Sequence, residues 1–116
     1  MIDLADVRIF VRTAPTNMTY SFDSLMGLAQ EVFDQDPTSG HLFLFFSRRR
    51  DRVKILFWDR DGFCIWYKRL EVGAFRVLIA ANDQLGIEIE YWQLATLLDG
   101  LDPKAACRRR PYRRVS

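Results

Sequence analysis

The spacing of apolar residues alternates between strand-like and helix-like along this chain of 116 residues. Residues 7–12 are rich in β-forming side chains and alternate imperfectly between apolar and polar, which predicts a first strand. From 22 to 35 the apolar residues recur every three or four positions, which predicts one amphipathic helix. Ser21 has the chemistry of its N-cap, and Asp36-Pro37 ends it. The apolar positions of this helix are Phe22, Leu25, Met26, Ala29, Val32 and Phe33.

After residue 40 the apolar period becomes two, which is typical of strands. Four strand-like runs follow, at 41–47, 52–58, 63–70 and 74–79. The segments 59–62 and 71–73 between them have turn composition, and we expect both to form three-residue loops. Residues 90–98 predict a short last helix with Glu90 as its cap and Gly100 after its end. Its apolar positions are Trp92, Leu94, Ala95, Leu97 and Leu98.

These elements predict a single α+β domain over residues 1–103. The economical topology is an antiparallel β-meander of four to five strands, with one amphipathic helix packed on one face and a short C-terminal helix. Residues 104–116 are a basic segment that we expect to be a disordered tail.

The two predicted loops fix a register for the sheet. With three-residue loops, residue 54 lies opposite 68, and 68 lies opposite 76, so Lys54, Lys68 and Arg76 form a row on one face. The next rows on that face hold Leu56, Trp66 and Leu78, then Trp58, Cys64 and Ala80. The opposite face is the predicted seat of the 22–35 helix, and it carries Val53, Ile55, Phe57, Ile65, Tyr67, Phe75, Val77 and Ile79.

The formal net charge of +2 conceals a segregated pattern. Segments 47–76 and 101–116 each carry a net charge of +5, whereas 1–46 and 77–100 each carry −4. Such segregation favours a polyanion or an acidic protein as partner, although a merely solvated surface also accounts for it. The candidate DNA-binding residues are Arg48, Arg49, Arg50, Arg52, Lys54, Lys68, Arg76, Arg108, Arg109, Arg110, Arg113 and Arg114.

Two tryptophans of the predicted sheet are candidates for contact with a partner. Trp58 and Trp66 stand near the predicted cationic row, where they can stack on bases or cover apolar surface of another protein. The alternative is that both are core residues beneath the last helix.

Catalytic chemistry is scarce in this sequence. His41 is the single histidine, it has no evident Ser or Cys partner, and we expect it to be structural. Cys64 and Cys107 have neither metal-ligand nor disulfide-framework spacing, and no phosphate-binding glycine motif occurs. We therefore expect no enzyme, no metal and no cofactor. With no apolar run of about 20 residues and no signal-peptide pattern at the start, we expect a cytoplasmic protein without membrane contact.

Several segments, taken in order, resemble a known family. They are Phe22 to Leu25, Asp36 to Phe45, Arg48 to Asp51, Lys54 to Asp59, Gly62 to Cys64 and Lys68 to Phe75. Together they are similar to the TnpB-type accessory protein of the IS66 class of bacterial insertion sequences, over about residues 5–102. The resemblance implies a small protein that is encoded beside a separate large transposase and assists transposition. The sequence departs from the family pattern at two places. Residues 17–23 lack the basic pair that the family tends to have there, and Glu90-Tyr91 stands where the family favours Thr-Pro at the start of the last helix.

The resemblance and the charge pattern together predict a non-catalytic accessory protein of an insertion sequence. It would assist DNA transposition by binding DNA, mainly at the phosphate backbone, or the element-encoded transposase, or both. The alternative is a pure protein–protein interaction module without DNA affinity. A second alternative, a small nucleic-acid enzyme, lacks a convincing carboxylate cluster in the sequence.

Overall fold

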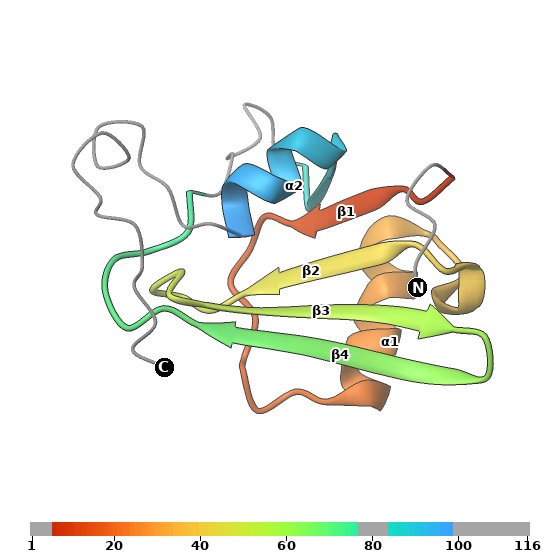
Figure 1. Ribbon diagram of the computed structural model, residues 1–116. Coiled ribbons are helices and arrows are strands. Elements are labelled where there is room, and N and C mark those ends of the chain that lie inside the picture. The colour runs from red at the N-terminus through yellow and green to blue at the C-terminus, as the bar shows by residue number, and fades with distance from the viewer. Residues whose placement is uncertain (1–5, 77–83, 99–116) are drawn as a thin grey trace, which may run out of the picture.

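The computed structural model describes residues 6–76 and 84–98 (Figure 1). Its strands are β1 (Ile9–Arg12), β2 (Leu42–Phe46), β3 (Arg52–Asp59), β4 (Gly62–Arg69) and β5 (Gly86–Ile89). Its helices are α1 (Phe22–Phe33), the short 3-10 helix η1 (Pro37–Ser39) and α2 (Tyr91–Leu98). α1 is two residues shorter than the predicted 22–35 helix, because Asp34 adopts a left-handed conformation with φ 51°. The predicted tail, 104–116, lies outside the described residues.

The five strands form one mixed sheet in the order β4-β3-β2-β1-β5. β1 pairs parallel with β2 and antiparallel with β5. The α+β class is therefore confirmed, but the all-antiparallel meander is wrong. The chain leaves β1, passes through α1 on one face and re-enters the sheet as β2 in the same direction, which is how a helical crossover connects parallel strands.

The predicted strand at 74–79 is also wrong where the structure describes it. Residues 74–76 are not in a strand, and 77–79 lie outside the described residues. Instead, the Phe75 N–H donates to the Arg50 carbonyl at 2.7 Å, and the Phe75 ring packs edge-on against Phe46 at 5.6 Å. This segment is thus tied to the β2–β3 turn, and the fifth strand is β5, on the opposite edge of the sheet.

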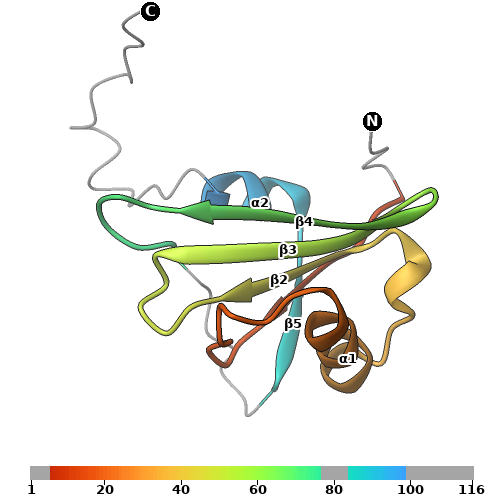
Figure 2. The same ribbon diagram turned by 90° about the horizontal axis from the view of Figure 1, so that it is seen from below.

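Helices cover both faces of the sheet (Figure 2). On one face Leu25 and Ala29 of α1 pack against Phe43 and Phe45. On the other, Leu94 and Leu97 of α2 join a cluster that includes Leu44. All five residues of β2 are buried, as expected for a central strand with both faces covered.

The β3–β4 hairpin has a different register from the predicted one. Asp59 pairs with Gly62, so the loop contains two residues, Arg60 and Asp61, and Arg60 takes the left-handed φ of 55°. Lys54 therefore lies opposite Tyr67, and Lys68 lies opposite Val53. A slip of one residue moves every side chain of a strand to the other face. The predicted row of Lys54, Lys68 and Arg76 does not exist.

The same slip overturns the predicted seat of the first helix. α1 packs on the face of Leu56, with Phe63 and Ile65 at the margin of that cluster. Val53 and Ile55 belong to the cluster beneath α2, and Phe57 packs against that cluster. The prediction that α1 covers this second face depends on a three-residue loop, which would align Val53, Ile55 and Phe57 with Ile65 and Tyr67.

Candidate nucleic-acid interface

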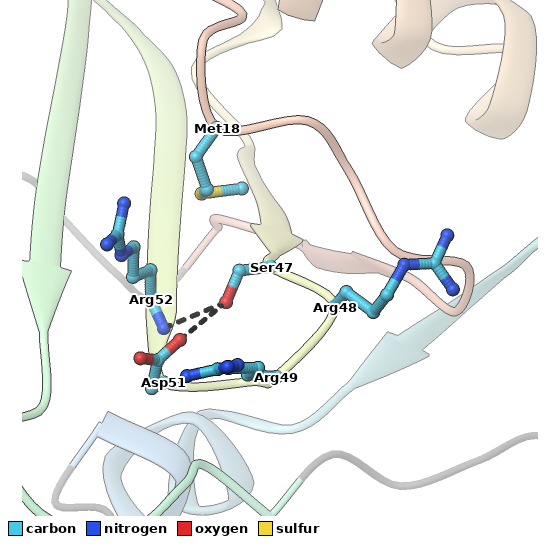
Figure 3. Close-up of a pocket in the computed structure, with 6 residues that line it drawn as sticks. All are labelled: Met18, Ser47, Arg48, Arg49, Asp51 and Arg52. Carbon is cyan, nitrogen blue, oxygen red and sulfur yellow. Dashed lines mark hydrogen bonds between the residues drawn. The ribbon is translucent and has the colours of Figure 1, made fainter.

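The turn between β2 and β3, residues 47–52, is held by its own backbone and by Ser47. The Ser47 N–H donates to the Arg52 carbonyl at 3.0 Å, and the Arg50 N–H donates to the Ser47 carbonyl at 2.9 Å. The Ser47 hydroxyl donates to an Asp51 carboxylate oxygen at 3.0 Å and accepts from the Arg52 N–H at 3.1 Å (Figure 3). Arg50 has the left-handed φ of 60°. The turn is therefore a defined structure that fixes where its arginines start.

The arginines of this turn differ in exposure and direction. Arg48 and Arg49 are exposed, whereas Arg50 and Arg52 are half-buried. In Figure 3 the Arg48 side chain extends away from the other labelled residues, and Arg52 extends on the other side of the pocket. A shallow, open pocket lies among these side chains, lined by Met18, Ser47, Arg48, Arg49, Asp51 and Arg52.

Arg52 connects this turn to a further arginine on β4. Arg52 and Arg69 are directly opposite each other in the β3–β4 ladder, so their side chains share one face. A second open pocket is lined by Arg52, Tyr67, Arg69 and Glu71. Arg69 pairs with Glu71 at 3.1 Å, but both side chains are largely exposed, and such surface pairs contribute little. We call Arg48, Arg49, Arg52 and Arg69 the basic surface.

Sequence reasoning missed Arg69 in this role. A two-residue loop at 60–61 places Arg52 opposite Arg69. The length of this loop is therefore the one feature of the sequence that could have predicted their pairing. Arginine seldom adopts the positive φ that such a loop requires. The composition of the turn therefore argued against the register that the structure has.

Lys54 is placed differently from the prediction. Its side chain is buried beneath the loop that precedes α1, and the residue is 9% exposed. The Nζ atom donates to the carbonyls of Met18 and Tyr20, each at 2.7 Å, and lies 4.8 Å from the centre of the Tyr67 ring. Its ammonium is thus engaged with the protein, and that Lys54 contacts DNA stays a prediction.

Of the other predicted cations, Lys68 is the one that the structure places on the opposite face from the Arg52–Arg69 pair. Lys68 lies on the α2 face, where its Nζ donates to the Leu98 carbonyl at 2.9 Å. Arg76 is exposed beyond the end of β4. Arg50 is half-buried within the turn. The tail arginines, Arg108, Arg109, Arg110, Arg113 and Arg114, lie outside the described residues. That any of these cations binds DNA stays a prediction.

The two tryptophans do not share a face as predicted. Trp58 is half-buried on the α1 side and contacts the Phe63 ring edge-on at 5.0 Å. Trp66 pairs with Ile55 on the α2 side and is 42% exposed. Trp58 therefore packs within the hairpin, and Trp66 is the more accessible of the two to a partner.

His41 belongs to a small polar group near the start of β1. Its Nδ1 accepts a hydrogen bond from the Arg8 N–H at 3.0 Å. Burial, followed by the charge of Arg8, lowers the pKa of His41 below its ordinary value. The Arg8 guanidinium donates to both carboxylate oxygens of Glu88, at 2.7 and 3.1 Å. This hydrogen bond lowers the pKa of Glu88. The group joins β1, β2 and β5, which is the structural role expected of His41.

Two further features concern the described ranges, 6–76 and 84–98. Within them, no group of three or more His, Cys, Asp or Glu side chains is arranged to hold a metal ion. Neither α1 nor α2 is long and apolar enough to cross a membrane.

Comparison with known proteins places this geometry in context. The model of a family described as "IS66 Orf2 like protein" matches residues 7–108. The uncharacterized protein y4hO of Sinorhizobium fredii is 35% identical over 97 residues, which is 84% of this chain and 83% of the relative. The uncharacterized protein y4jC of the same organism is 31% identical over 108 residues, which is 93% of this chain and 90% of the relative. No solved structure matches the chain.

Proposed function

Because this chain belongs to the IS66 Orf2-like family of TnpB-type insertion-sequence accessory proteins, we propose that it assists transposition by binding DNA. The basic surface would make the contact, chiefly with phosphates. Phosphate contacts supply most of the affinity of sequence-independent binding and carry no base information. We therefore propose that the protein binds DNA within a transposition complex, with little sequence preference of its own.

The observation that carries this proposal is the pairing of Arg52 with Arg69, beside exposed Arg48 and Arg49. Like charges directly opposite on a sheet are destabilising. Of the acids nearby, Asp51 accepts from the Ser47 hydroxyl inside the turn, and Glu71 is a solvent-exposed partner of Arg69. A phosphate group between the guanidinium groups would offset their repulsion and supply bidentate acceptors. Fold stability offers no comparable reason for this arrangement.

Fluorescence anisotropy with a labelled duplex at three salt concentrations tests the proposal. We expect wild type to bind at low salt and to lose affinity steeply as the salt rises. Arg69→Gln should lower the salt slope by about 0.9, and Arg48→Ala with Arg49→Ala by about twice that, if each side chain contacts one phosphate. Arg60→Gly is the matched control, because Arg60 is an exposed loop arginine at the opposite end of the hairpin. It should leave the slope unchanged.

Absence of binding by wild type at low salt would reject the DNA proposal. The basic surface would then be assigned to an acidic protein partner, with the element's transposase as first candidate. Equal losses for Arg60→Gly and Arg69→Gln would reject the surface while keeping DNA binding.

The second candidate function is binding of the transposase without DNA. It is favoured by two large exposed side chains at the start of α2, Tyr91 at 56% and Trp92 at 67%. Aromatic side chains of this kind often anchor protein interfaces. A pull-down with the element's transposase, with and without terminal DNA, discriminates the two. A complex that forms without DNA and is lost in Trp92→Ala supports this candidate.

A further inference from the structure

An exposed tyrosine stands beside the arginines of the basic surface. Tyr67 is 48% exposed. It lies opposite Lys54 in the β3–β4 ladder, two residues along the same face from the Arg52–Arg69 pair. It lines the same pocket as Arg52, Arg69 and Glu71. Guanidinium groups at this position suit phosphates, whereas an aromatic ring offers a flat apolar face.

The Tyr67 ring is held in place from within the protein. The Lys54 ammonium lies 4.8 Å from the ring centre, and its hydrogen bonds to the Met18 and Tyr20 carbonyls hold it there. A cation at this distance attracts the ring face electrostatically. The ring is therefore ordered before any ligand arrives, which lowers the entropic cost of binding to it.

The backbone of a second exposed tyrosine contacts the same ammonium. The carbonyl of Tyr20 accepts from Lys54 Nζ at 2.7 Å, and Tyr20 is 37% exposed. Lys54 thus ties the backbone of the pre-α1 loop to the Tyr67 ring of β4, beside the basic surface.

We propose that this end of the sheet binds single-stranded DNA, with bases stacked on Tyr67 and phosphates on Arg52 and Arg69. The inference rests on the proposed function and specifies its ligand. In a duplex the faces of internal bases are covered by their neighbours, so an exposed ring gains little from it. In a single strand every base offers a face for stacking, and arginines next to aromatic rings are the usual means of binding it. Both pockets are shallow, which suits a flexible strand.

The test compares three labelled probes by fluorescence anisotropy at one low salt concentration. They are oligothymidine of about 15 nucleotides, an abasic strand of the same length, and a duplex of the same length. Wild type should bind oligothymidine at least several-fold more tightly than either other probe. The abasic strand keeps the phosphates and removes the bases, so this comparison needs no variant.

Two variants of Tyr67 then test whether the bases stack on its ring. Tyr67→Leu should weaken oligothymidine binding by about tenfold, as expected for one lost stacking contact. Tyr67→Phe keeps the ring face and should bind as wild type does. Leu85→Ala is the control, because Leu85 is a large exposed apolar residue just before β5, at the opposite edge of the sheet from β4.

The outcomes separate this inference from the proposed function. If wild type binds the duplex or the abasic strand as tightly as oligothymidine, the single-strand inference is wrong and DNA binding stands. An unchanged affinity in Tyr67→Leu also overturns it. If none of the three probes binds at low salt, the proposed function itself fails.

Discussion

Arg52 and Arg69 face each other across the β3–β4 ladder, with their side chains on the α1 side of the sheet. Directly opposed like charges cost stability in a sheet. The protein therefore maintains a locally unfavourable pair at the place where an anion would be bound. Such an exchange of stability for binding is common at functional sites.

Replacement of Arg69 by threonine should stabilise the protein while weakening DNA binding. Threonine suits a strand, and the repulsion from Arg52 is removed, so we expect a gain of about 0.2–1 kcal/mol in the free energy of unfolding. Urea denaturation measures this gain, and a salt titration with duplex DNA measures the loss of affinity. A variant that is both less stable and equally good at binding would contradict the interpretation.

Replacement of Lys54 by methionine should destabilise the fold. The carbonyls of Met18 and Tyr20 would lose their shared donor, and the Tyr67 ring would lose its cation. We expect a loss of about 1–3 kcal/mol in urea denaturation, the typical cost of unsatisfied buried polar groups. Lys68→Met is the matched control, because Lys68 is half-buried and donates to the single carbonyl of Leu98. A larger loss for Lys68→Met than for Lys54→Met would refute this account.

Stability should fall between neutral and mildly acidic pH because of His41. Burial lowers the pKa of His41 below 6.5 in the folded protein, so the unfolded chain takes up a proton more readily. The resulting stability is present above pH 6.5 and is lost as the pH falls through the lowered pKa. Protonation also removes the acceptor for the Arg8 N–H. Urea midpoints between about pH 7.5 and 5 measure the effect. His41→Gln should flatten this dependence, and an equal slope in the variant would assign it to other groups.

The first residue of β5, Gly86, packs directly against the end of α1. A Cβ atom at Gly86 would overlap the Phe33 ring, so Gly86→Ala should cost about 1–3 kcal/mol, as overpacking does. Gly27 on the exposed side of α1 is the matched control, since a Cβ there meets no atom within 4 Å. Gly27→Ala should instead add about 0.4–1 kcal/mol. Thermal denaturation of the two variants measures both changes, and a loss of stability in both would point to a cause other than the Phe33 contact.

Deletion of residues 104–116 should leave the fold intact and weaken DNA binding. The apolar clusters that the structure describes are built without this segment, so we expect the thermal midpoint to change by a few degrees at most. Five arginines would be lost, and the salt slope should fall by about 0.9 for each phosphate contact among them. Loss of the cooperative thermal transition would show instead that the domain needs this segment.

Local patterns predicted several elements of this fold. The run of apolar residues at 42–46 is β2, and the three- and four-residue spacing from Phe22 to Phe33 is α1. Both patterns arise because one face of the helix or strand is buried, and the period of that face can be read from a few neighbouring residues. β5 (Gly86–Ile89) has no counterpart among the predicted strands, because four residues that include glycine and glutamate give no clear period.

Strand order and register could not be predicted in the same way. The parallel pairing of β1 with β2 depends on where α1 places the chain, and no local period encodes that choice. The register of β3 and β4 depends on whether the loop at Arg60 contains two residues, as in the structure, or three, as predicted. For the candidate site, the sequence predicted the exposed arginines of the turn. Arg69 and Tyr67 could be assigned to the same site only once the register of β3 and β4 was known.

The position of β5 determines when this protein can finish folding during its synthesis. Arg8 and Glu88 are 80 residues apart in the chain, yet they meet across β1 and β5. One edge of β1 stays unpaired until the ribosome has released residues 86–89, and Leu94 and Leu97 of α2 arrive later still. The β3–β4 hairpin needs only neighbouring residues, so it can form early. A nascent chain that stalls before β5 would expose an apolar sheet face and a free strand edge, which are features that promote aggregation.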